Sequence, residues 1–185
     1  GDSGVDELVG VERLRFSDGV VVAVTNPDVA TLSEDGSIAV DVLANDFDLD
    51  DDVLTVTSAS GGDLAFSVDG EGRLAISAAG AYDALAEGEF AFETVTYVVD
   101  AGDGLSATGE VSVTVEGAND PAIFSGDLNG AASEDDPATA IVTGTLVVSD
   151  VDGADAVVPA TVAGTYGELT IVADGTWTYA LDGSS

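Results

Sequence analysis

Hydrophobic residues recur at every second position through most of this chain. The alternation is clearest at 38–42, 54–57, 94–99 and 111–116, where Val, Ile, Leu and Tyr alternate mainly with Thr, Ser and Ala. Successive side chains of a strand point to opposite faces, so these segments are predicted to be half-buried strands. Turns rich in Gly and Asp separate them. Many short strands at regular spacing predict an all-β sandwich, and only residues 82–87 could hold a helical turn.

An internal repeat divides the chain. Ser33-Glu34-Asp35 recurs as Ser133-Glu134-Asp135, and Asp46-x-Asp48 recurs as Asp150-x-Asp152. The period is about 100 residues, the size of one immunoglobulin-like Greek-key sandwich. The sequence therefore predicts two such sandwiches in tandem.

The expected domains are 29–118 and 122–185, joined by short linkers that contain Pro. The second copy lacks counterparts of the last two strands of the first, 90–99 and 105–116. We therefore expect the second sandwich to be incomplete, with part of its core and its edges exposed. Its strands are expected near 123–127, 139–149, 157–162, 166–173 and 176–182.

Residues 1–25 form a third piece. The opening nonapeptide GDSGVDELV fits the calcium β-roll pattern G-G-x-G-x-D-x-U-x at every fixed position except the second. Residues 11–24 then have the pattern of a hairpin around Ser17-Asp18-Gly19. These features predict the end of a β-roll with a capping hairpin, and a Gly/Asp-rich loop is the alternative.

Composition excludes several kinds of chemistry. The chain has 36 Asp and Glu against 3 Lys and Arg, no His and no Cys, and its net charge is −33. Thiolate, imidazole and amine catalysis is therefore absent, as are zinc, copper and haem sites. No basic stripe exists for nucleic acid, and no apolar run reaches the ~20 residues of a membrane span. We expect no enzyme activity, no nucleic-acid partner and no membrane insertion.

Carboxylates are concentrated in one loop. Residues 46–52 contain five Asp. At about 5 Å and an effective dielectric constant of about 20, each pair repels by about 3 kcal/mol. Alternate Asp side chains of an extended loop point to one side, which suits a calcium ion with six to eight oxygen ligands. The run is not an EF-hand, because the sixth and twelfth positions are Asp51 and Thr57 instead of Gly and Glu.

Greek-key topology predicts where the acidic loops gather. The loops 45–52 and 100–104 should lie at one end of the first sandwich, beside the linker that holds Asp28. Glu34 and the exit linker 119–120 should lie at the other end. Acidic residues are thus expected at both domain junctions, where several calcium ions would bind.

The sequence resembles three families found together in very large bacterial surface proteins. The segments TLSEDGSIAVDVLANDFDLDDDVLTVTS, TYVVDAGDG and VSVTVEGANDP are similar to cadherin-like repeats. TGTLVVSDVDGAD and GTYGELTIVADGTWTYALD resemble the first half of a VCBS repeat. The opening nonapeptide and GVERLRFSDG resemble the end of an RTX (repeats-in-toxin) β-roll. The resemblance implies tandem cadherin-like sandwiches and calcium between domains.

The same resemblance assigns ligands to two sites. It implies an interdomain site with Glu34, Asn119, Asp120, Asp150 and Asp152, and a site above the first sandwich with Asp46, Asp48, Asp50 and Asp100. With the residues that topology adds to these ends, the candidate calcium ligands are Asp28, Glu34, Asp46, Asp48, Asp50, Asp52, Asp100, Asp103, Asn119, Asp120, Asp150 and Asp152.

The function implied is that of a calcium-stiffened spacer in a bacterial RTX-type adhesin, exported by type I secretion to the cell surface for adhesion and biofilm formation. Its partners would be neighbouring repeats of the same chain, and it would be monomeric. The alternative is a calcium-dependent module that binds carbohydrate or another surface polymer, for which Phe47 is the candidate exposed aromatic residue.

Three other interpretations compete. Paired carboxylates can hydrolyse glycosides, but clusters this dense suit a metal better than one poised acid. The bonds Asp120-Pro121 and Asp136-Pro137 are candidates for calcium-triggered self-cleavage. An acidic composition also favours solubility in salty surroundings without any metal. That last interpretation predicts acids spread along outward strand positions, whereas here they crowd the loops.

Overall fold

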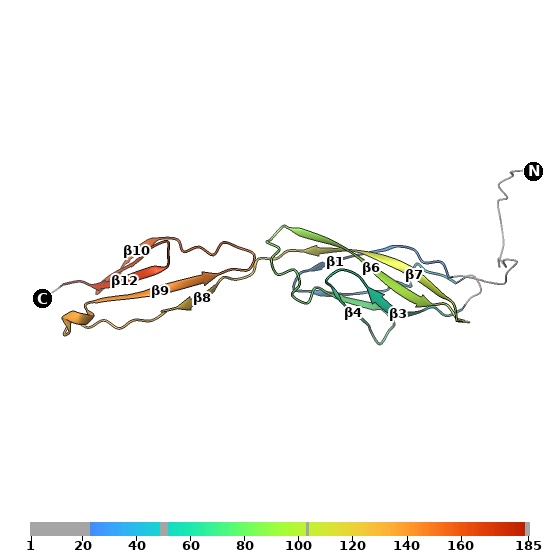
Figure 1. Ribbon diagram of the computed structural model, residues 1–185, viewed down its shortest axis with the longest axis horizontal. Helices are drawn as coiled ribbons and strands as arrows, with labels where there is room; N and C mark the ends of the chain where they lie inside the picture. The colour runs from blue at the N-terminus through green and yellow to red at the C-terminus, as the bar shows by residue number, and fades with distance from the viewer. Residues whose placement is uncertain (1–22, 49–51, 103, 184–185) are drawn as a thin grey trace, which may run out of the picture. The chain divides into compact units, whose positions relative to one another are not determined.

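The computed structural model describes residues 23–48, 52–102 and 104–183. The chain divides between Ala118 and Asn119 into two compact units, called unit 1 and unit 2 below. The strands of both units confirm the predicted all-β fold class (Figure 1). The β-roll and hairpin expected at 1–25 lie outside the described residues, apart from 23–25.

Unit 1 is a two-layer sandwich of seven strands. One sheet has the order β1-β7-β6-β3 and the other the order β2-β5-β4. β1 runs parallel to β7, and the other pairs are antiparallel. The strands are β1 (Asp28–Ser33), β2 (Ser37–Val40), β3 (Thr55–Ser60), β4 (Ala65–Val68), β5 (Leu74–Ser77), β6 (Phe90–Asp100) and β7 (Ser106–Glu116).

The core of unit 1 lies between these sheets. Alternate residues of the two longest strands are buried, among them Val95, Tyr97 and Val113. They contact Leu74 and Ile76 of the opposite sheet, which are fully buried in the same hydrophobic cluster. Full burial of one such side chain stabilises the fold by about 1.5–3 kcal/mol. The period-two pattern of the sequence therefore becomes the inward face of a sandwich.

Unit 2 is a single antiparallel sheet of five strands in the order β10-β11-β12-β9-β8. Its described residues form no second sheet, and none of their hydrophobic side chains is buried. The sandwich is therefore incomplete, as the sequence predicted. Its elements are β8 (Ile123–Gly126), the 3-10 turn η1 (Pro137–Thr139), β9 (Ile141–Ser149), β10 (Ala160–Ala163), β11 (Gly167–Ile171) and β12 (Thr176–Leu181).

Two local features differ from expectation. Residues 82–87 form turns and no helix, although Leu85 N donates to Tyr82 O at 2.9 Å. The only helical turn among the described residues is η1. The Asp136 side chain caps this turn by accepting a hydrogen bond from Ala138 N at 3.0 Å, and Pro follows at the first position, where no N–H is needed. No helix in the described part of the chain is long and apolar enough to cross a membrane.

Candidate functional site

The entry segment of unit 1 is attached to the loop between β2 and β3. Val24 and Phe47 exchange two backbone hydrogen bonds, of 2.8 and 3.1 Å, and Asn26 Nδ2 donates to Asn45 O at 2.6 Å. Thr25 Oγ1 donates to the carbonyl of Thr108 in β7 at 2.8 Å. The structure thus places the acidic loop beside the entry linker, as the topology predicted. The Phe47 side chain stays half exposed.

The buried hydroxyl of Tyr97 holds two of the candidate acids together. It donates to Asp46 Oδ2 at 2.9 Å, with Val42 O at 3.2 Å and Asp28 Oδ2 at 3.4 Å as further acceptors. The other Asp46 oxygen accepts from Asn26 N at 2.8 Å. Tyr97 was not among the sequence candidates. The signal in the sequence was a Tyr within the alternating apolar pattern of a buried strand, because a buried Tyr hydroxyl needs a hydrogen-bond partner.

The Tyr97 hydroxyl has a single proton and lies within hydrogen-bond distance of two carboxylates, Asp28 and Asp46. Burial, followed by the charge of Asp46, raises the pKa of Asp28. Burial and the hydrogen bond to Asp46 also raise the pKa of the Tyr97 hydroxyl, which therefore stays protonated and remains a donor. The Asp28–Asp46 pair carries negative charge at neutral pH that a cation would offset.

Neutralising Asp28 should stabilise unit 1 when calcium is absent. Because the folded-state pKa of Asp28 is raised, its contribution to stability is full below the unfolded pKa and is lost as pH rises through the folded pKa. In chelator at pH 7, Asp28→Asn should therefore raise the melting temperature by a few degrees, about 4 °C. The gain should shrink as the pH is lowered, because the raised pKa makes wild-type Asp28 take up its proton at a higher pH than an ordinary Asp. Glu110→Gln, which removes an exposed charge from β7, is the matched control; an equal effect of both substitutions would contradict the interpretation.

Three further candidates lie at this end, two on the β2–β3 loop and one at the last residue of β6. Asp52 N donates to Asp48 Oδ1 at 3.4 Å, and Gly102 N donates to Asp100 Oδ1 at 3.0 Å. A Cβ atom at Gly102 would come within 2.4 Å of Asp52 Oδ2, so the Asp52 carboxylate lies directly against the β6–β7 turn. The structure therefore brings Asp52 to the turn that Asp100 organises. Asp50 and Asp103 lie outside the described residues.

Glu34 lies at the opposite end of unit 1 and is 0 % exposed. Its backbone N donates to Glu116 O at 2.9 Å, and its Oε1 accepts from Ala118 N at 2.7 Å. Its Oε2 is buried and has no hydrogen-bond partner among the described residues. A buried ionised carboxylate costs several kcal/mol unless it is paired or binds a metal. This unpartnered oxygen is the feature of unit 1 that best suits a cation ligand.

Unit 2 begins with a smaller group of candidates. Asp120 N donates to Asp152 Oδ2 at 3.2 Å, and Asn119 Nδ2 donates to Asp120 O at 2.8 Å. Asp150 Oδ1 accepts from Gly153 N at 2.9 Å. Asp152 Oδ1 is a second buried oxygen without a hydrogen-bond partner among the described residues.

The described residues contain no group of three or more acidic side chains already arranged to hold a metal. They do supply hard oxygen donors, including the buried, unpartnered oxygens of Glu34 and Asp152. Carboxylate and backbone carbonyl oxygens are the ligand class of calcium, so the donor chemistry fits this ion. Glu34 belongs to unit 1, and the other four residues of the interdomain set belong to unit 2.

Comparison with known proteins gives a family and similarity to solved structures. A family model described as "Bacterial Ig domain" matches residues 18–114, just over half of the chain. No curated protein matches the sequence. The solved structure of protocadherin gamma B2 extracellular cadherin domains 3–6 is similar with a TM-score of 0.42 and 12 % identity; the match covers 88 % of this chain and 39 % of that one. By the family match and the sandwich of unit 1, this chain belongs to the bacterial Ig domain family.

Proposed function

We propose that the protein is a calcium-binding, extracellular repeat segment of a bacterial surface adhesin, in which calcium ions stiffen the succession of domains. The observation that carries this proposal is the buried, unpartnered carboxylate oxygen of Glu34 at the end of unit 1. The resemblance of the sequence motifs to cadherin-like repeats supports the proposal, which includes export by type I secretion.

Among the described residues, no cation of the chain compensates Glu34, and calcium would. The three Arg residues are Arg13, Arg15 and Arg73, and Arg73 pairs with Asp69 at 2.8 Å and Glu71 at 2.9 Å. No described basic side chain lies in an ion pair with Glu34. A divalent ion from the medium would compensate the buried charge and accept the free oxygen as a ligand.

The acids at the entry end of unit 1 support a second site. Asp28 and Asp46 share the Tyr97 hydroxyl. Asp52 lies on the β2–β3 loop against the β6–β7 turn, and Asp100 is the last residue of β6 before that turn. When bound, calcium would supply positive charge and oxygen coordination there. The chain's own contribution is to hold these carboxylates in place through Tyr97 and the attached linker.

Calcium would stiffen the chain because the carboxylates that would bind it lie next to the backbone that joins the two units. Glu34 hydrogen-bonds the amide of Ala118, and Asp152 hydrogen-bonds the amide of Asp120. Residues 118 and 119 are consecutive, so ions held by these acids would restrain the backbone that joins the units. Extracellular modules bind calcium with dissociation constants of about 0.1–1 mM. At tenfold excess each ion stabilises by about 1.4 kcal/mol.

Calcium should bind with millimolar affinity and stiffen the chain. We expect a calorimetric titration to saturate with more than one ion, and small-angle scattering to give a larger maximum dimension in calcium than in chelator. Magnesium at equal ionic strength is the control, because it demands a more regular octahedral shell and retains its waters. No binding heat, or a maximum dimension that calcium leaves unchanged, would refute the proposal.

A further inference from the structure

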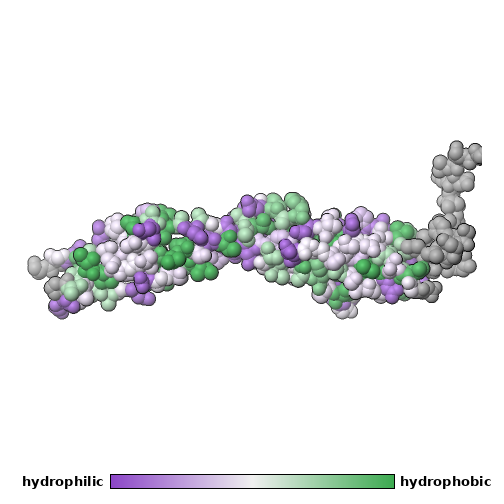
Figure 2. Space-filling model, viewed as in Figure 1, coloured by the Kyte–Doolittle hydropathy of each residue, from purple (hydrophilic) through white to green (hydrophobic). Residues whose placement is uncertain are grey.

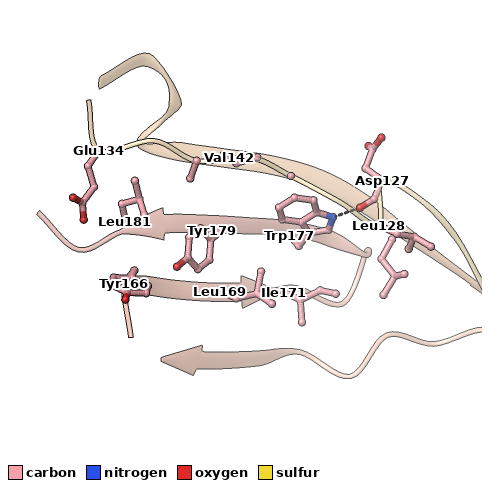
Figure 3. A pocket seen from close by; sticks show the side chains of 13 residues that line it. Asp127, Leu128, Glu134, Val142, Tyr166, Leu169, Ile171, Trp177, Tyr179 and Leu181 are labelled. Carbon is pink, nitrogen blue, oxygen red and sulfur yellow. Dashed lines mark hydrogen bonds between the residues drawn. The ribbon is translucent and has the colours of Figure 1, made fainter. Parts of the chain in front are cut away.

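One face of the unit 2 sheet carries a row of apolar side chains that nothing in the described residues covers. They line a groove of about 810 Å³ (Figure 3). The surface view also shows hydrophobic residues on unit 2 (Figure 2). The groove residues that come from strands β9, β11 and β12 are Val142, Leu146, Leu169, Ile171, Trp177, Tyr179 and Leu181.

Strands β9, β12 and β11 repeat an arrangement of three strands in unit 1, where the corresponding face of the sheet is buried. There β2, β5 and β4 are neighbours in that order, and Ile38, Ile76 and Phe66 are paired across them. In unit 2 the neighbours are β9, β12 and β11, and Val142 and Leu169 flank Tyr179. The unit 1 face is buried under the long hairpin β6–β7, whereas the unit 2 face is open.

Two more strands of unit 2 take partners different from those of their unit 1 counterparts. In unit 1, β1 pairs with β7 and β3 pairs with β6, so both belong to the sheet built on the hairpin. The corresponding strands of unit 2, β8 and β10, pair with β9 and β11 instead. Unit 2 therefore contains a counterpart of every unit 1 strand except the two that form the hairpin.

The internal repeat indicates where a hairpin equivalent to β6–β7 would end in unit 2. Glu34 of the first Ser-Glu-Asp motif is held by two residues at the end of β7, through Glu116 O and Ala118 N. Glu134 occupies the same place in the second motif, lines the groove and is exposed. By analogy with Glu34, its carboxylate would accept a backbone amide that no described residue provides.

Charge argues against a second copy of the chain as the cover. All three basic residues precede unit 2, so unit 2 has only negative charges. Two such faces brought together would also bring two Glu134 carboxylates to one interface, and the whole chain carries −33. Repulsion of this kind opposes self-association, so a segment of the same polypeptide is favoured.

We propose that the groove is covered by an antiparallel β-hairpin supplied by the chain on the C-terminal side of β12. Its inward positions alternate apolar residues, and an amide just past its second strand donates to Glu134. In unit 1, β5 ends at Ser77, β6 begins 13 residues later (90 − 77) and unit 1 ends 41 residues later (118 − 77). The hairpin of unit 2 is therefore expected within a similar distance of Leu181.

Trp177 is the only Trp of the chain and lies in the groove, so it reports on the cover. The experiment compares the 185-residue chain with the same chain extended by about forty residues along its own gene, the length that unit 1 needs. We expect the extension to shift Trp177 emission to the blue, to reduce its acrylamide quenching several-fold, and to abolish binding of an apolar dye. A gene that lacks two alternating segments there, or a Trp177 equally quenched in both chains, would overturn the proposal. So would a 185-residue chain that is dimeric with Trp177 protected, because the cover would then be a second copy.

Neighbouring residues on opposite faces of β9 provide matched variants. Leu146 lines the groove, whereas Val147 is exposed on the other face. In the extended chain, Leu146→Ser should restore quenching of Trp177, and Val147→Ser should not. Glu134→Gln should lower the melting temperature of the extended chain and leave the 185-residue chain unchanged. Equal effects of the two β9 variants would contradict a cover on the groove face.

Discussion

Adding a single methyl group at residue 109, by Gly109→Ala, should abolish the cooperative unfolding transition of unit 1 or lower its stability by about 3 kcal/mol. Gly109 on β7 pairs directly with Tyr97 on β6. A Cβ atom there would lie 2.2 Å from Tyr97 Cζ and 2.3 Å from its hydroxyl oxygen. The ring cannot move aside, because it is fully buried and its hydroxyl is held by Asp46 and Val42.

The two units can be measured separately in this experiment. The only Trp lies in unit 2, so its fluorescence should be unchanged while far-ultraviolet circular dichroism records the loss of unit 1. Gly70→Ala is the control, since a Cβ there meets nothing within 4 Å and its φ is not left-handed. Shortening the opposing side chain, in Gly109→Ala combined with Tyr97→Leu, should recover part of the stability. A Gly109→Ala protein as stable as Gly70→Ala would show that the ring is not confined.

Replacing Glu34 by Gln should reverse the sign of its effect on stability between chelator and calcium. In chelator the substitution removes a buried charge with one unpartnered oxygen, so the melting temperature should rise. In calcium it should fall, because a strong ligand is lost. Wild-type protein should gain roughly 6 °C at tenfold calcium excess from one site, and most of this gain should disappear in the variant.

Asp35→Asn is the matched control for this substitution. Asp35 is adjacent in the same turn and is exposed, and its change removes the same charge. It should preserve the response to calcium within about 1 °C. If Glu34→Gln retained the full response, calcium would bind elsewhere and the role given to Glu34 would be wrong.

Much of the fold could be predicted from the sequence because burial follows the period-two pattern. Val95, Val111 and Val115 were placed on inward faces by alternation alone, and the structure confirms this. The all-β class was predicted for the same reason, and the incomplete second sandwich because the second copy lacks counterparts of the last two strands of the first. The parallel pairing of β1 with β7 was not, because an alternating strand satisfies its burial in either sheet and its partner is chosen by long-range contacts.

The candidate site was predictable only where topology alone decides position. Glu34 was placed at the exit end of unit 1 and Asp28 beside the loop of Asp46, and both lie there. The Tyr97 hydroxyl escaped prediction, because alternation gives the direction of a side chain and does not identify the polar atoms that it meets across 51 residues of sequence. The burial of Glu34 was equally invisible, since turn residues with charges are normally solvated.

The pairing of β1 with β7 has a mechanical consequence. The strands at the entry and exit of unit 1 lie side by side and parallel over six residue pairs, from Asp28–Val111 to Ser33–Glu116. When the two ends of the unit are pulled apart, these strands are loaded in shear. Their hydrogen bonds then share the load and must break together, whereas an antiparallel end pair would open one bond at a time. Resistance to force is set by the unfolding rate, so unit 1 is built to carry tension along its chain.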